Sequence, residues 1–98
     1  MTHYWISQLA EQDLEAIGDF IAQDNPHRAL AFIAELRNQC TKISASPKAF
    51  RLRPKLGNDI RSCAYGNYVI FFQESPAGLC IVRVLHSAMD IEDRFSEK

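Results

Sequence analysis

The strongest constraint on the fold is a series of strand-like runs separated by turn residues. Positions 60–65 and 68–72 are two strand-like runs, and the Gly66-Asn67 pair between them is typical of a two-residue hairpin turn. A Ser-Pro-Ala-Gly turn then leads into a third run, 79–86. We therefore predict a three-stranded antiparallel meander.

The middle run predicts a sheet that is apolar on both faces, since side chains alternate along a strand. In the last run, two sets of side chains alternate. Cys80, Val82, Val84 and His86 form one set, and Leu79, Ile81, Arg83 and Leu85 form the other. The first set is more nearly apolar, so we assign it to the face that packs on helices.

This assignment leaves Arg83 on the open face, and we expect Arg61 to join it there. Burying an unpaired charge costs on the order of several kcal/mol of free energy. We therefore predict that Arg61 and Arg83 meet something other than this chain's own core.

Two helices are predicted before the meander. Residues 4–7 form a short strand-like run, after which Ser7 is a good N-cap for an amphipathic helix over 8–23. Asn25-Pro26 ends that helix and begins a second one, which extends to about Ala45. The short connection predicts an antiparallel helix hairpin.

A chain of 98 residues is long enough for a single domain, 1–98, with one core. The predicted class is α+β: an N-terminal strand and an antiparallel helix hairpin packed on one face of a twisted antiparallel sheet, in the order β-α-α-β-β-β. We expect residues 90–98 to form a mobile tail or a short helix.

Charge is concentrated in one basic band, although the net charge is only −1 and carries no nucleic-acid signature. Residues 47–61 contain a single acidic residue and five basic ones, namely Lys48, Arg51, Arg53, Lys55 and Arg61. We expect this band to face a binding partner rather than to stabilise the fold.

The three cysteines, Cys40, Cys63 and Cys80, stand singly in apolar stretches, as expected of small buried side chains in a reducing compartment. We expect neither a metal nor a cofactor. The chain shows no signal-peptide pattern and no membrane-length apolar segment, so a cytoplasmic location is the simplest prediction.

One set of features extends along nearly the whole chain, from about Ser7 to Asp90. It comprises residues 13–17, the Asn25-Pro26 break, Ala29 with Phe32, Pro47, Arg51, Arg61-Ser62, residues 68–72, residues 83–86 and Asp90. The most specific element is the closing Arg-Val-Leu-His with an Asp four residues later. In this order of features the chain resembles the ParE toxins of the RelE/ParE superfamily.

The resemblance implies a type II toxin that inhibits DNA gyrase and is neutralised by a cognate ParD-like antitoxin in a hetero-oligomer. From the charge balance and the lack of a membrane-length apolar segment, we expect no membrane association and no direct sequence-specific binding of nucleic acid. We expect the antitoxin or the target to contact the open sheet face and the groove beside the helix hairpin, through Arg51, Arg53, Lys55, Arg61 and Arg83.

Two alternatives remain open at this point. A RelE-like, metal-independent endoribonuclease acting at the ribosome would use Arg61, Arg83 and His86. RelE-like nucleases commonly carry a Tyr near the C-terminus, where this chain has Met89, Ile91 and Phe95, and this difference favours gyrase inhibition over an enzymatic activity. The third possibility is an inactive interaction module of the same fold.

Overall fold

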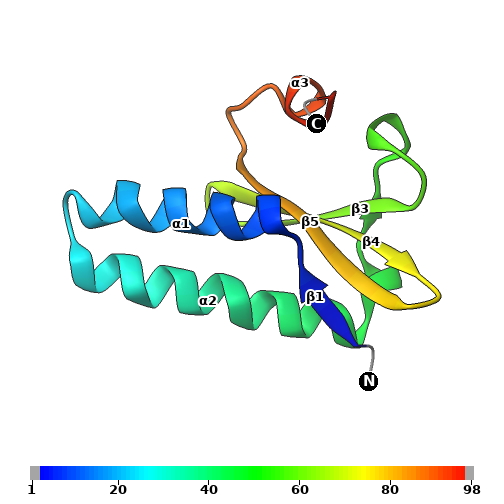
Figure 1. Cartoon of the computed structure of the whole chain (residues 1–98), viewed down its shortest axis with the longest axis horizontal. Coiled ribbons are helices and arrows are strands. Elements are labelled where there is room, and N and C mark those ends of the chain that lie inside the picture. The colour runs from blue at the N-terminus through cyan, green and yellow to red at the C-terminus, as the bar shows by residue number, and fades with distance from the viewer. Residues whose placement is uncertain (1–2, 97–98) are drawn as a thin grey trace.

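A computed structural model of the chain describes residues 3–96, without the side chains of residues 93, 94 and 96. A helix hairpin lies against one face of a five-stranded sheet, and a short C-terminal helix lies on the opposite face (Figure 1). The elements are β1 (Tyr4–Ile6), α1 (Gln8–Ala22), α2 (Pro26–Ala45), β2 (Arg51–Leu52), β3 (Ile60–Tyr65), β4 (Tyr68–Ser75), β5 (Gly78–His86) and α3 (Ile91–Ser96). The predicted α+β class is confirmed, with β2 and α3 added to the predicted element order.

The helix hairpin forms as its caps and apolar spacing predict. Ser7 accepts a hydrogen bond from the Ala10 N–H, and Asn25 accepts one from the Arg28 N–H, so each cap satisfies a backbone donor that the first turn leaves unpaired. The apolar stripes of the two helices then meet the sheet in the main core, which includes Ala10, Leu14, Ile17, Phe32, Leu36, Cys40, Ile43, Cys63, Ile70, Phe72, Leu79, Ile81 and Val84.

The sheet has the strand order β1-β5-β4-β3-β2. Strands β3, β4 and β5 form the predicted antiparallel meander, and β2 adds an antiparallel edge strand from within the basic band. In contrast to the predicted antiparallel sheet, β1 pairs with β5 in parallel. The sheet is therefore mixed. The β1 backbone aligns with the start of β5, where the Leu79 N–H donates to the His3 carbonyl oxygen.

A β-bulge changes the faces of β5. Phe71 lies opposite Arg83, whereas the next residue, Phe72, lies opposite Ile81, so Val82 is the extra residue on the bulged strand. The predicted alternation is therefore wrong before the bulge, at Leu79, Ile81 and Val82, and correct after it, where Val84 faces the helices and Arg83 and Leu85 lie on the other face. Residues Leu79, Ile81 and Val84 pack in the core under the helices, whereas Val82 and Leu85 belong to a cluster on the opposite face.

That second cluster covers the sheet face predicted to be open. Ile60, Phe71 and Leu85 are buried there by Leu56, Val69, Val82, Ile91 and Phe95. The Phe95 ring of α3 meets the Phe71 ring edge-on, with 5.0 Å between centroids. The expectation of an uncovered apolar face is thus wrong, because the 3₁₀ turn Pro54–Leu56 and α3 cover its centre. Of the predicted tail, residues 97–98 lie outside the described residues.

Cys40 and Cys63 are buried free thiols, as predicted, and Cys80 is half-buried. Within residues 3–96, no helix has the length and apolar character needed to cross a membrane.

Candidate functional site

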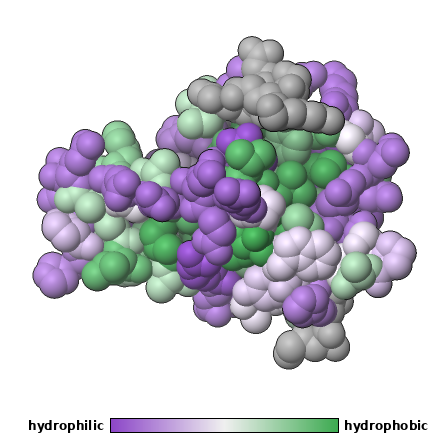
Figure 2. Space-filling view, viewed as in Figure 1, coloured by the Kyte–Doolittle hydropathy of each residue, from purple (hydrophilic) through white to green (hydrophobic). Residues whose placement is uncertain are grey.

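A groove with a volume of about 740 Å³ runs along the solvent side of the helix hairpin. Its floor includes Ala29 and Ile33 of α2, and Leu30 projects at its side with 76% of its surface exposed. The α1 side carries carboxylates, among them Glu15 and Asp19. Figure 2 shows apolar side chains gathered along the hairpin between polar ones. Exposed apolar surface of this kind marks interaction sites in soluble proteins.

A second groove, of about 340 Å³, lies on the other side of α1, between that helix and the ends of β4 and β5. Phe20 projects beside it with 67% of its surface exposed, and Met89 borders it at 40% exposure. Tyr68 and His86 stack edge to face within it, with ring centroids 5.1 Å apart. Apolar grooves therefore flank α1 on both sides.

Polar and aromatic contacts fix the end of the sheet against α2. The Tyr65 hydroxyl and the Arg28 guanidinium both donate to Glu35, at 2.9 and 2.8 Å. These bonds, chiefly that from Arg28, lower the pKa of Glu35, and the bond to Glu35 raises the pKa of Tyr65. Phe32 packs against both Tyr65 and Tyr68. This cluster joins α2 to β3 and β4, and its Tyr68 also lines the second groove.

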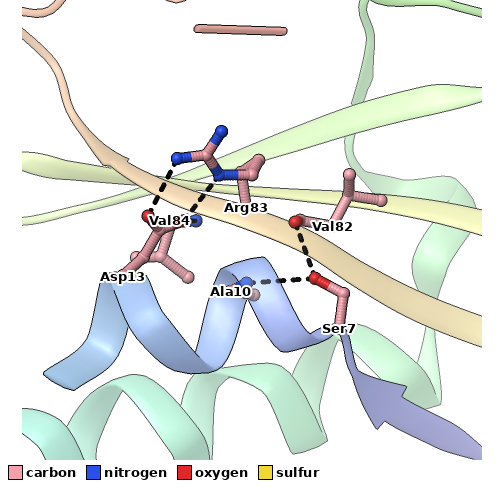
Figure 3. Close-up of polar contacts among 6 residues, drawn as sticks. All are labelled: Ser7, Ala10, Asp13, Val82, Arg83 and Val84. Atoms are coloured by element: carbon pink, nitrogen blue, oxygen red, sulfur yellow. Dashed lines mark hydrogen bonds and ion pairs between the residues drawn. The ribbon is translucent and has the colours of Figure 1, made fainter. Parts of the chain in front are cut away.

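Arg83 is bound within the chain, by Asp13 of α1 (Figure 3). Asp13 Oδ2 accepts from Arg83 Nε at 2.8 Å and from the Val84 N–H at 3.0 Å, while Oδ1 accepts from Arg83 Nη2 at 3.0 Å. At the N-terminus of α1, six residues before Asp13, the N-cap Ser7 donates its hydroxyl to the Val82 carbonyl oxygen at 2.9 Å. These side chains form hydrogen bonds with backbone groups of β5 that lie beyond the end of β1, and they thereby join α1 to the sheet.

Sequence reasoning did not single out Asp13. Its position carries a usable signal, because it lies three residues after Ala10 and four before Ile17, beside the buried stripe of α1. A carboxylate at that spacing requires a polar partner on the surface that the helix covers.

The predicted site residues do not share one surface. Arg61 lies opposite Phe72, which is in the core under the helices, whereas Arg83 lies opposite Phe71 on the other face. Since directly opposed residues point to the same face of a sheet, the expectation that the two arginines share a face is wrong. Arg61 Nη1 instead donates to the Phe50 carbonyl oxygen at 2.7 Å.

The rest of the basic band has mixed roles. Lys48 pairs with Glu74 at 3.2 Å, and Arg53 donates to the Ser62 hydroxyl at 3.3 Å with its guanidinium 5.8 Å from the Phe71 ring centroid. Arg51 and Lys55 are exposed. Together with Arg53, Leu56 and Glu92, they line a cleft of about 370 Å³.

These features define a class of protein: a small α+β domain whose central sheet charges are bound internally and whose accessible surface offers apolar grooves and a basic cleft. In residues 3–96, no group of three His, Cys, Asp or Glu side chains is arranged to hold a metal ion.

Comparison with known proteins names the family. A family model described as the ParE toxin of the type II toxin–antitoxin system parDE matches residues 4–91, so the chain belongs to the ParE toxin family. Among solved structures, a chain of the chromosomal ParDE toxin–antitoxin system from P. aeruginosa has the same fold, with a TM-score of 0.74 and 19% identity, over 88% of this chain and 96% of that one. No curated protein matches the sequence significantly.

Proposed function

We propose that this ParE-type toxin of a type II toxin–antitoxin module acts by inhibiting DNA gyrase. The match of the ParE family model over residues 4–91 is the main support. The placement of the charged side chains adds to it, since metal-free RNA cleavage needs an acid, a base and cations that converge on one phosphate. Arg61 and Arg83 point to opposite faces, and His86 Nδ1 accepts a hydrogen bond from the Ala88 N–H.

Two assays on the same purified protein test the target. Increasing amounts of toxin are added to a gyrase supercoiling reaction and, separately, to a translating extract in which the integrity of the message is followed. We expect supercoiling to be inhibited and the message to remain intact. Cleaved message with unaffected supercoiling would establish the nuclease alternative, and no effect in either assay would leave an inactive interaction module.

The proposed partner is a ParD-like antitoxin that binds the helix-hairpin groove. Burying an exposed Leu side chain contributes about 1.5–3 kcal/mol, and Leu30 is largely exposed beside that groove. We therefore expect Leu30→Ser to weaken the complex by about ten- to hundredfold without destabilising the free toxin.

The binding assay is calorimetric titration with a ParD-like antitoxin, to be sought in a short open reading frame adjoining the gene. Lys42→Ala is the matched control, because Lys42 is an exposed residue of α2 that does not line the groove. An unchanged dissociation constant for Leu30→Ser would remove the groove from the interface. Arg61 and Arg83 remain predicted contacts, now on two separate faces, and the same titration tests each.

A further inference from the structure

Strand β2 is an edge strand with one side available for pairing. It ends the strand order β1-β5-β4-β3-β2 and pairs only with β3 in the part of the chain that the structure describes. The Arg53 N–H donates to the Ile60 carbonyl oxygen at the continuation of this pairing. Because hydrogen-bonded pairs alternate along an antiparallel ladder, the N–H and C=O of the preceding residue, Leu52, point away from β3.

The side chains along this edge differ between its two faces. Arg51 lies opposite Ser62, and Arg53 contacts the Ser62 hydroxyl, so both arginines lie on the face of β3 that carries Ser62. Leu52 lies opposite Arg61 on the other face, with 44% of its surface exposed. The edge thus presents positive charge on one face and an apolar side chain on the other.

We propose that the outer edge of β2 binds an extended segment of a partner protein by strand addition. Residues of the added strand alternate between faces. Acidic side chains at alternate positions therefore reach Arg51 and Arg53, and the apolar residue between them lies beside Leu52. Main-chain hydrogen bonds supply affinity in this mode of recognition, and the alternating side chains supply specificity. The proposal does not depend on gyrase being the target.

Charge selects this occupant over two others. A second copy of the chain would bring its own Arg51 and Arg53 to the same edge, and like charges on adjacent strands are destabilising. Nucleic acid offers no peptide main chain to pair with the outward N–H and C=O of Leu52. An acidic, extended peptide satisfies both the hydrogen-bonding edge and the arginines.

The test uses defined peptides and fluorescence anisotropy. The probe is fluorescein-labelled Gly-Ser-Glu-Val-Glu-Val-Gly-Ser, and its isomer Gly-Ser-Glu-Glu-Val-Val-Gly-Ser has the same charge without the alternation. We expect the isomer to bind at least fivefold more weakly. Arg51→Gln should weaken binding of the probe about fivefold, whereas Lys48→Gln, which removes the same charge from a side chain paired with Glu74, should leave it unchanged.

Backbone methylation separates strand pairing from simple attraction between charges. Two further probes carry a single N-methyl group, one on the first Val and one on the Glu that follows it. Since successive N–H groups of a strand point to opposite sides, one methylated probe should lose binding and the other should keep it.

Any one of four results would overturn the proposal. The first two are equal binding of the probe and its isomer, and full binding by both methylated probes. The others are a loss of probe affinity with Lys48→Gln equal to that with Arg51→Gln, and no binding of the probe at all. Tighter binding of a single-stranded oligonucleotide of the same charge would assign the edge to nucleic acid instead. Concentration-dependent dimerisation of the toxin that Arg51→Gln enhances would assign it to self-association. Circular dichroism of each variant confirms that the fold is retained.

Discussion

The bond between Asp13 and Arg83 should be the most important polar contact for stability in this protein. The side chains are only 14% and 13% exposed, and Asp13 accepts three hydrogen bonds, two of them from the guanidinium and one from the Val84 N–H. Removing one partner of a buried ion pair costs about 3–5 kcal/mol. Because both side chains retain some contact with water, we expect Asp13→Ala to lower the free energy of unfolding by about 3 kcal/mol.

A double-mutant cycle isolates the interaction from the other contacts of each residue. The variants are Asp13→Ala, Arg83→Ala and the double substitution, each measured by urea unfolding followed by circular dichroism. We expect a coupling energy of about 2 kcal/mol and, for Asp13→Ala, a melting temperature lower by about 10–20 °C. Asp13→Asn should be less damaging, since its amide oxygen still accepts from the Val84 N–H.

The chain contains a matched control pair. Glu11 of α1 and Arg37 of α2 also form two hydrogen bonds, but their side chains are 48% and 46% exposed. Exposed pairs typically contribute about 0.2–1 kcal/mol, so the control cycle should give a coupling energy of about 0.5 kcal/mol. If the coupling of Asp13 to Arg83 is no larger than that of the control, the assigned role of the pair in holding α1 to β5 is wrong.

Three further predictions concern the core and the turns. Phe95→Ala should lower the free energy of unfolding by about 2 kcal/mol and increase binding of a hydrophobic dye, because it uncovers Phe71; an unchanged urea midpoint would show that α3 contributes no packing. Burial raises the pKa of the Cys40 thiol from 9.0 to about 11. The unfolded thiol therefore ionises first, and stability falls as pH rises from 9.0 towards about 11; Cys40→Ala should reduce this slope, and an equal slope in the two proteins would contradict the assignment. Gly78→Ala should cost about 2–3 kcal/mol, because φ is +137° and a Cβ would lie 2.6 Å from the His3 carbonyl oxygen; a melting temperature within 2 °C of the original, by differential scanning calorimetry, would refute that strain (about 0.5 kcal/mol or less).

The sequence by itself determined the parts of the fold that depend on neighbouring residues. Ser7, Asn25 and Pro26 mark the helix ends because capping needs only a side chain and the amides that follow it. The alternation along β4 correctly separated the side chains of its two faces, since that strand is regular where it was analysed. The resemblance to ParE was also present in the sequence, and the family match over residues 4–91 confirms it.

The alternation along β5 correctly predicted Arg83 on the face away from the helices, but only the tertiary structure decided that Arg61 lies on the helix face. The bulge at Val82 exists because β4 and β5 pair with one extra residue on β5, and the pairing of two strands is not encoded in the alternation of either one. That single residue changes which side chains of β5 face the helices. It leaves Arg83 on the face opposite Arg61 and within reach of Asp13, seventy residues earlier in the chain.

The surfaces available to partners were decided in the same way. Leu56, Ile91 and Phe95 cover the second face of the sheet, although they stand in segments that look like a loop and a charged tail. The basic band is one group in the sequence, but the fold gives its members different roles. Lys48 pairs with Glu74 at the surface, and Arg53 and Arg61 form hydrogen bonds within the chain. Arg51 lies on the edge strand β2. Composition fixes how many charges a segment carries, but strand pairing fixes which of them meet a partner.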